Sequence, residues 1–342
     1  MEYNFYVGSY ARQGDVSISR YRADFQRGSL VRELSCTELD WPSYVLPHPN
    51  GKIVYAVREL TEEGAIHALE ICGDKLVRRC TLTTGGNDPC NLCLDDENRF
   101  LFVADYSGST VSVFSLDENG MPVKMVLCRR HEGHGPNPKR QTVPHPHFVH
   151  YRDGKLYICD LGTDSVYICA FDKSAAALTD VGRISFPAGA GPRHLVFHPR
   201  HPELVYVICE LSSEIYLFRL ENDCAELLQS VSTLPAGFTG ETKTAAIKFS
   251  ADGSALFASN RGHDSIALFS VSENGLLTAK QICPCGGQTP RDFSVFGEYL
   301  VCGNQDSDLI TVLHFDAEKC ALAPCPMTIS HSSPTAIMKA EV

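Results

Sequence analysis

Two positions recur throughout this chain, and charged and imidazole side chains accumulate at both. The first position follows a small or proline-containing step and is occupied by Ser43, Cys90, His147, Arg193, Ala245, Arg291 and Thr335. The second position ends a nearby apolar run and is occupied by Tyr10, Glu59, Tyr106, Leu161, Glu210, Arg261 and Gln305. If these positions meet, three arginines, two carboxylates and an imidazole would form a site for a small anionic substrate.

Side chains of these types can serve several reactions, and the hydrolysis of an ester-type bond, which the resemblance given at the end of this section implies, is one of them. This reaction needs a base that activates water, donors that stabilise an oxyanion, and an acid that protonates the leaving alkoxide. His147 or Glu210 would be the base, and the sequence leaves both open. In that reaction we expect Arg193 and Arg261 to contact the oxyanion and the carboxyl oxygens of the substrate, and Arg291 to bind a phosphate group through its guanidinium fork.

Further substrate contacts are expected at the same two positions or directly beside them. Besides Arg291, the expected substrate-binding residues are His194, Gln305, Asn304, Glu59 and Tyr106. The chain contains no Gly-x-Ser-x-Gly motif that would supply a serine nucleophile, so we expect water to attack the substrate directly. We expect no metal ion and no other cofactor.

The two positions recur because the chain repeats itself in steps of 44 to 57 residues. The units open at Pro42, Pro89, Pro146, Pro192, Thr244, Pro290 and Pro334. Each complete unit contains further short runs rich in Val, Tyr, Phe and Leu, as at 53–59 and 110–116, whose length and composition favour strands over helices. A repeat of this length built from strands is typical of β-propeller blades.

The sequence therefore predicts an all-β fold, a seven-bladed β-propeller with about four antiparallel strands per blade. The last unit lacks its partner strands, and residues 3–10 carry their pattern. We therefore expect the N- and C-terminal strands to share one blade and close the ring. Residues 1–342 would form a single domain, with an insertion loop at 129–144.

The first strand of each propeller blade lines a central channel, so equivalent positions in successive blades form rings around it. We expect the side chains of His147, Arg193, Glu210 and Arg261 to come from four blades and to meet in one pocket at a channel mouth. Loops and strand ends on a rigid scaffold are common places for binding sites.

Composition excludes several other functions. The net charge of −11 argues against a nucleic-acid partner, which requires a basic face. The chain contains no run of 18 apolar residues that would predict a membrane span. Its first residues also lack the pattern of a secretion signal, so we expect a cytoplasmic protein. The 15 cysteines, the Cys90–Cys93 and Cys283–Cys285 pairs included, are expected to be reduced thiols without zinc. The sequence leaves the oligomeric state open.

Several segments resemble the propeller-type 6-phosphogluconolactonases. The most specific are GAGPRHLVFHP at 189–199, the strand YVICELSSEI at 206–215, and SNRGHDSI at 259–266. The likeness continues in GPNPKRQ at 135–141, TPRDFSV at 289–295 and NQDSDLI at 304–310, and thus covers essentially the whole chain. The chain departs from the family pattern in ending one strand ICEL rather than VNEL, and in placing Trp41 where an Asn is usual.

The resemblance implies an enzyme that acts on lactones. The site proposed for the family maps onto His147, Arg193, Glu210 and Arg261 of this sequence. We expect metal-independent hydrolysis of a small anionic sugar lactone, 6-phosphogluconolactone or a close relative. Two alternatives stay open: a cycloisomerase of the carboxymuconate-lactonizing type, which belongs to the same family, and a non-enzymatic propeller that binds a protein partner.

Overall fold

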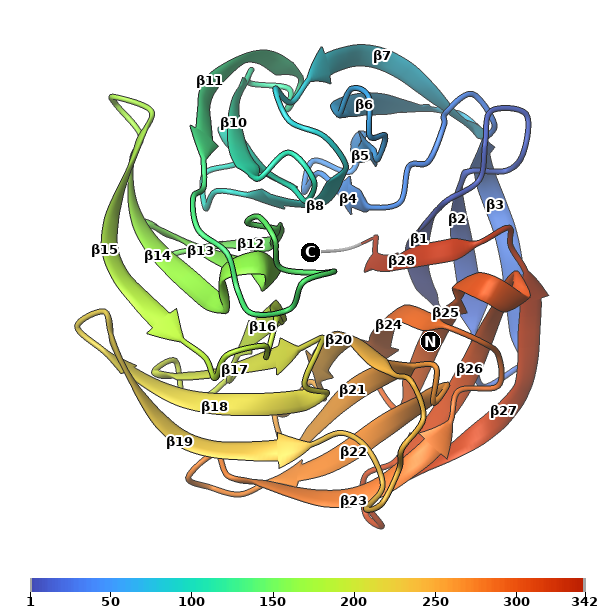
Figure 1. Ribbon diagram of the computed structural model, residues 1–342. Coiled ribbons are helices and arrows are strands. Elements are labelled where there is room, and N and C mark those ends of the chain that lie inside the picture. The colour runs from blue at the N-terminus through green and yellow to red at the C-terminus, as the bar shows by residue number, and fades with distance from the viewer. Residues whose placement is uncertain (1, 341–342) are drawn as a thin grey trace.

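The computed structural model describes residues 2–340, which form seven blades of four antiparallel strands around a central channel (Figure 1). Two neighbouring blades are also joined at their outer edges by a single parallel contact, between Ser35 and Lys75. The first three blades along the chain consist of β4 (Val45–Pro47), β5 (Ile53–Arg58), β6 (Ala65–Cys72) and β7 (Lys75–Thr83); β8 (Pro89–Leu94), β9 (Phe100–Asp105), β10 (Thr110–Leu116) and β11 (Pro122–Arg130); and β12 (Pro146–Arg152), β13 (Lys155–Asp160), β14 (Ser165–Asp172) and β15 (Ala177–Ser185).

The next three blades follow the same order from the channel outward. They consist of β16 (Pro192–Phe197), β17 (Leu204–Cys209), β18 (Glu214–Glu221) and β19 (Cys224–Ser232); β20 (Lys243–Phe249), β21 (Ala255–Arg261), β22 (Ser265–Val271) and β23 (Leu277–Pro284); and β24 (Pro290–Phe296), β25 (Tyr299–Asn304), β26 (Leu309–Asp316) and β27 (Ala321–Ser330). Two short 3₁₀ turns, η1 (Leu161–Thr163) and η2 (Gln305–Ser307), follow β13 and β25.

The seventh blade joins the two ends of the chain, as the sequence predicted. Its inner strand is β28 (Pro334–Lys339), and its outer strands are β1 (Tyr3–Ser9), β2 (Ile18–Asp24) and β3 (Ser29–Cys36). β1 pairs antiparallel with β28 on one side and with β2 on the other. The predicted all-β propeller, including its mode of closure, is therefore confirmed.

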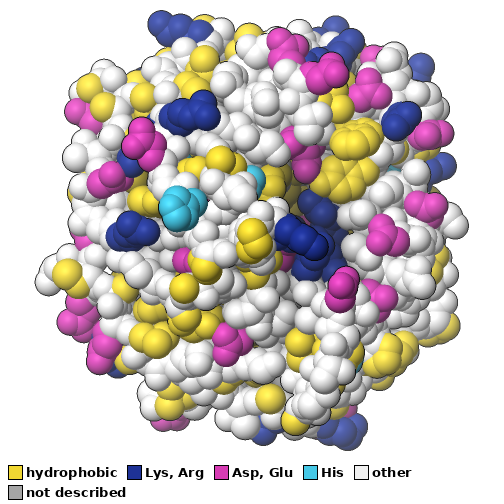
Figure 2. All heavy atoms as spheres, viewed as in Figure 1, with side chains coloured by type: hydrophobic (Ala, Val, Ile, Leu, Met, Phe, Trp, Pro, Cys, Tyr) yellow, Lys and Arg dark blue, Asp and Glu magenta, His cyan; other side chains and the backbone are white. Residues whose placement is uncertain are grey.

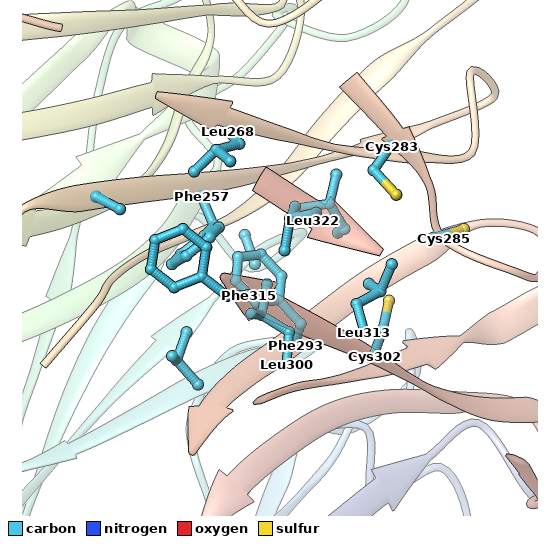
Figure 3. Packing of buried hydrophobic residues seen from close by; sticks show 14 residues of the cluster. Phe257, Leu268, Cys283, Cys285, Phe293, Leu300, Cys302, Leu313, Phe315 and Leu322 are labelled. Carbon is cyan, nitrogen blue, oxygen red and sulfur yellow. The ribbon is translucent and has the colours of Figure 1, made fainter. Parts of the chain in front are cut away.

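Apolar side chains fill the space between neighbouring blades. Figure 3 shows one such cluster, in which Phe257 and Leu268 of one blade pack with Phe293, Leu313 and Phe315 of the next. All five side chains are nearly or completely buried. Tight packing of this kind fixes the blades relative to one another, so the ends of the inner strands are held in set positions around the channel.

The loop between β11 and β12 crosses the face of the ring near the channel (Figure 1). Its buried Gln141 anchors it, because the side-chain Nε2 donates to the Leu161 carbonyl at 2.9 Å and to Asp164 Oδ1 at 2.7 Å. Gly162 lies directly beneath, where a Cβ atom would come within 2.1 Å of the Val143 carbonyl. The insertion predicted at 129–144, within the 57-residue repeat that opens at Pro89, is thus an ordered loop packed on the site face.

Candidate active site

A polar cavity of about 200 Å³ opens at the mouth of the channel where the inner strands begin. Its lining residues are Glu59, Cys90, Tyr106, Arg140, His147, Glu210, Arg261 and Arg291. A smaller space of about 20 Å³ adjoins it deeper in the channel and is lined by Ser43, Tyr44, Glu59, Cys90, His147, Arg193, His194, Arg291, Asp292 and Thr335. Figure 2 shows this face, with Lys and Arg side chains gathered in the hollow over the channel.

Glu210 is the centre of a cluster of three arginines. One carboxylate oxygen, Oε2, accepts from Arg261 Nη2 at 2.7 Å and from Arg193 Nε at 3.0 Å. The other, Oε1, accepts from Arg140 Nη2 at 2.6 Å. The side chains of Glu210 and Arg193 are each only 3 % exposed. Charge-assisted hydrogen bonds of this length are among the stronger polar contacts in proteins, so Glu210 fixes the positions of all three guanidinium groups.

The charges of the cluster fix its protonation states. Burial opposes the ionised form of Glu210, but Arg261, Arg193 and Arg140 together hold its pKa well below the ordinary value. Burial and the neighbouring Arg261 lower the pKa of Arg193 to about 9, which still leaves it protonated at neutral pH. Glu210 is therefore a carboxylate surrounded by cations, which makes it a weak proton acceptor.

His147 lies beside this cluster at the start of β12 and lines both cavities. Burial, reinforced by Arg193, lowers its pKa well below the ordinary value, so the imidazole is neutral at pH 7. Its Nδ1 atom is buried and has no hydrogen-bond partner among the described residues. The ring packs edge-to-face against Tyr106, with centroids 5.6 Å apart. A neutral histidine with an unused nitrogen is suited to act as a base.

A second carboxyl group, Glu59, lies in different surroundings. Its Oε1 accepts from the Tyr10 hydroxyl at 2.6 Å, and its Oε2 accepts from the Ser43 hydroxyl. Arg291 does not pair with it directly. Instead, Arg291 Nη2 donates to the Tyr10 hydroxyl at 2.7 Å, and the guanidinium carbon lies 4.9 Å from the centre of the Tyr10 ring. Burial raises the pKa of Glu59 above its ordinary value, although Arg291 opposes the shift.

The structure brings together most of the residues predicted from the sequence. His147, Arg193, Glu210 and Arg261 converge as expected, but they come from three blades rather than four, because Arg193 and Glu210 belong to the same blade. The expected residues Arg291, Glu59 and Tyr106 line the cavity of about 200 Å³ at the mouth, the outer cavity. Arg291, Glu59 and the expected His194 line the smaller space below it, the inner cavity.

Two predicted substrate contacts lie elsewhere. Asn304 is completely buried, and its amide donates to Thr311 Oγ1 at 2.9 Å and to the Leu309 carbonyl at 3.2 Å, within its own blade. Gln305 lies behind Arg291, whose Nη1 is 3.4 Å from Gln305 Oε1. Neither residue lines the two cavities.

The site also contains a residue that the repeat could not reveal. Arg140 comes from the β11–β12 loop and donates to Glu210 and, at 3.0 Å, to the Tyr106 hydroxyl. Loop residues have no repeat register, so the only available signal was the family segment at 135–141 in which Arg140 occurs. Tyr10 and Ser43 do occupy the two recurring positions, but they were not among the predicted site residues.

A larger cavity of about 530 Å³ lies at the other end of the channel, where the inner strands finish. Its walls are mainly apolar, with contributions from Leu46, Phe197 and Phe249. No carboxylate or imidazole of residues 2–340 lines it. We therefore place the chemistry at the arginine-rich mouth, although the cavity there is smaller.

The arrangement can bind an anion and activate water. Four guanidinium groups line the two cavities against three carboxyl groups, those of Glu59, Glu210 and Asp292, although the chain as a whole has a net charge of −11. Within the part of the chain that the structure describes, no three His, Cys, Asp or Glu side chains are placed to hold a metal ion. Nor does that part contain a helix long and apolar enough to cross a membrane.

Comparisons with known proteins agree with this chemistry. Residues 4–339 match the sequence model of the family described as "Lactonase, 7-bladed beta-propeller". The chain is 32% identical to a 6-phosphogluconolactonase of Bacillus subtilis over 98% of both chains. It is similar to a solved structure of a putative 6-phosphogluconolactonase from Bacteroides fragilis, with 28% identity, a TM-score of 0.91, and coverage of 99% of this chain and 98% of the other. A periplasmic gluconolactonase of Pseudomonas aeruginosa gives 27% identity and a TM-score of 0.92 over 99% of both chains.

Proposed function

The chain belongs to the family of seven-bladed β-propeller lactonases, which are lactone-hydrolysing enzymes, and we propose that its substrate is 6-phosphogluconolactone. The observation that carries this proposal is the group of four arginines at one channel mouth, with a neutral histidine among them. A phosphorylated sugar lactone presents both a phosphate that guanidinium groups bind well and a carbonyl that they can polarise.

We assign the role of general base to His147 rather than to Glu210. Both oxygens of Glu210 already accept from guanidinium groups, and its depressed pKa makes it a poor proton acceptor. His147 is neutral, and one of its ring nitrogens has no hydrogen-bond partner within residues 2–340. In this mechanism His147 takes a proton from the attacking water, and Glu210 orients the arginines that surround the substrate.

The arginines retain donors for the substrate after their protein contacts are made. A guanidinium group has five N–H donors. Arg193 uses Nε on Glu210 and Nη1 on the Ala245 carbonyl. Arg261 uses Nη2 on Glu210 and on the Thr244 carbonyl, while its Nε is buried without a partner in the described part of the chain. The remaining N–H groups would stabilise the oxyanion that forms when water attacks, and Arg291 and Arg140 would bind the phosphate.

Initial rates of lactone loss, corrected for spontaneous hydrolysis, would test this function. We expect kcat/KM to be higher for 6-phosphogluconolactone than for unphosphorylated δ-gluconolactone. Arg140→Gln and Arg291→Gln should remove most of that difference and affect the unphosphorylated lactone less. Equal kcat/KM for the two lactones would refute the phosphate assignment. Formation of a muconolactone from carboxymuconate without lactone hydrolysis would favour the cycloisomerase alternative.

The cytoplasmic location stays a prediction from the sequence. The P. aeruginosa relative is a periplasmic protein, so family membership does not fix the compartment.

A further inference from the structure

Two carboxyl groups of the site, those of Glu210 and Glu59, are held in contrasting ways. Glu210 accepts from three cationic groups, whereas the direct donors to Glu59 are two neutral hydroxyls. Glu59 lines both the outer and the inner cavity, so its carboxyl group borders the space available to a substrate. A carboxyl group without a direct cationic partner can carry a proton that a carboxylate among guanidinium groups does not, so Glu59 and Glu210 are suited to different roles.

We infer that Glu59 is the general acid of the reaction, the group that protonates the ring oxygen as the lactone opens. This inference rests on the proposed lactone hydrolysis and assigns its second proton transfer. Water attack leaves an alkoxide as the leaving group, and a poor leaving group of this kind needs a proton in the transition state.

The groups around Glu59 are consistent with a carboxyl that carries a proton during turnover. Burial raises its pKa, and the nearby Asp88 acts in the same direction, whereas Arg291, Ser43 and Tyr10 lower it. Cys90 also faces it, as a thiol whose own pKa is raised by burial and by Glu59. Arg291 reaches Glu59 only through the Tyr10 hydroxyl, so no guanidinium group locks the carboxyl in its ionised form.

The proton balance closes with His147 as the partner. The water oxygen bonds to the carbonyl carbon, and the proton that water loses goes to His147. The ring C–O bond then breaks, its electron pair leaves with the ring oxygen, and that oxygen takes the proton from Glu59. The proton on His147 returns to Glu59 through solvent, which restores both groups and leaves an open-chain hydroxy acid.

Glu59→Gln would test this role, because Gln keeps the size of the side chain and cannot give up a proton. We expect kcat for δ-gluconolactone to fall by about 10²-fold, a typical contribution of a general acid. Dihydrocoumarin opens to a phenolate whose conjugate acid has a pKa of about 10, and such a group leaves without a proton. For this substrate the fall in kcat should be less than about tenfold.

The pH profile supplies a second readout that a purely structural role would not change. An acid must be protonated, so the wild-type kcat should fall on the alkaline side as Glu59 loses its proton, and Glu59→Gln should lack this fall. Tyr10→Phe removes a donor to the carboxylate and therefore raises the pKa of Glu59, so its alkaline fall should move to higher pH. This variant also keeps the test open if Glu59→Gln does not fold.

The outcomes separate the inference from the function on which it rests. A Glu59→Gln variant with near wild-type kcat, or with equal losses on both lactones and an unchanged pH profile, overturns the acid role and leaves the lactonase function intact. A wild-type protein that hydrolyses none of 6-phosphogluconolactone, δ-gluconolactone and dihydrocoumarin overturns both. If only dihydrocoumarin were inert with the wild type, the pH profile on δ-gluconolactone would decide.

Discussion

Replacement of Glu210 by Gln should destabilise the protein strongly, because three buried or half-buried guanidinium groups share this one carboxylate. The exposed fractions of the Arg193, Arg261 and Arg140 side chains are 3 %, 12 % and 28 %. Removing one partner of a buried ion pair typically costs about 3–5 kcal/mol, since the remaining charge is left without compensation. The amide oxygen of Gln can keep some of the hydrogen bonds, so we expect the lower end of this range, about 3 kcal/mol.

This loss should depend on pH in a defined direction. The folded-state pKa of Glu210 lies below its unfolded value, so its contribution to stability is fully present above the unfolded pKa of about 4.3. As the pH falls through this value toward the folded pKa, the wild-type protein loses the contribution. The difference between wild type and Glu210→Gln should therefore be constant near pH 7 and shrink below about pH 4.

Urea unfolding at pH 7 would measure the effect as a change in midpoint at similar slope. Arg140→Gln supplies the matched variant, because Arg140 is the most exposed of the three cations and comes from a loop. In the double variant one uncompensated charge is gone, so its loss of stability should be smaller than the sum of the single losses by about 0.5–3 kcal/mol. A midpoint of Glu210→Gln equal to that of the wild type, or strict additivity with Arg140→Gln, would refute the idea that Glu210 is the hub of the cluster.

Three further results are expected. Because burial depresses the pKa of His147, the wild-type kcat/KM should stay high at pH values below the ordinary histidine pKa of 6.5, and His147→Gln should abolish activity at every pH; an acid-side fall centred at or above 6.5 would contradict this. Removal of residues 1–10 deletes β1 and leaves β28 and β2 without their common partner, so thermal unfolding of any soluble product should begin well below that of the full chain, and an unchanged Tm would speak against the closure. Native alkylation followed by mass spectrometry should label the exposed Cys128 and Cys224 first and reach all 15 thiols only after unfolding; early labelling of buried Cys159 or Cys209 would be inconsistent with the packing.

The sequence could predict the fold and much of the site because both depend on the same repeat. Residues at equivalent positions of successive inner strands must surround one channel, so His147, Arg193 and Arg291 could be grouped without any coordinates. Glu210 and Arg261 lie at the ends of equivalent second strands, and the same reasoning applies to them. In a propeller, register alone converts sequence spacing into spatial proximity.

Register gives the position of a side chain but not its direction or its partners. Asn304 directly precedes Gln305, which occupies one of the two recurring positions. Its amide nevertheless donates to Thr311 Oγ1 and to the Leu309 carbonyl within the blade. Arg140 has no register, and the anchoring of its loop through Gln141 depends on tertiary contacts with Leu161 and Asp164 that no local pattern encodes. The choice between His147 and Glu210 as base likewise needed the hydrogen-bond partners of each group.

Closure of the ring and assembly of the site are linked through Tyr10. This residue directly follows β1, and its backbone N–H donates to the Ser333 carbonyl just before β28, at 3.1 Å. Its hydroxyl accepts from Arg291 and donates to Glu59, so it connects the charges of two different blades. Ser43, the other donor to Glu59, lies in the next segment, where its carbonyl accepts from Thr335 Oγ1 at 2.7 Å. The strand that closes the propeller thus ends within the site, and the surroundings of Glu59 form only when the two ends of the chain have met.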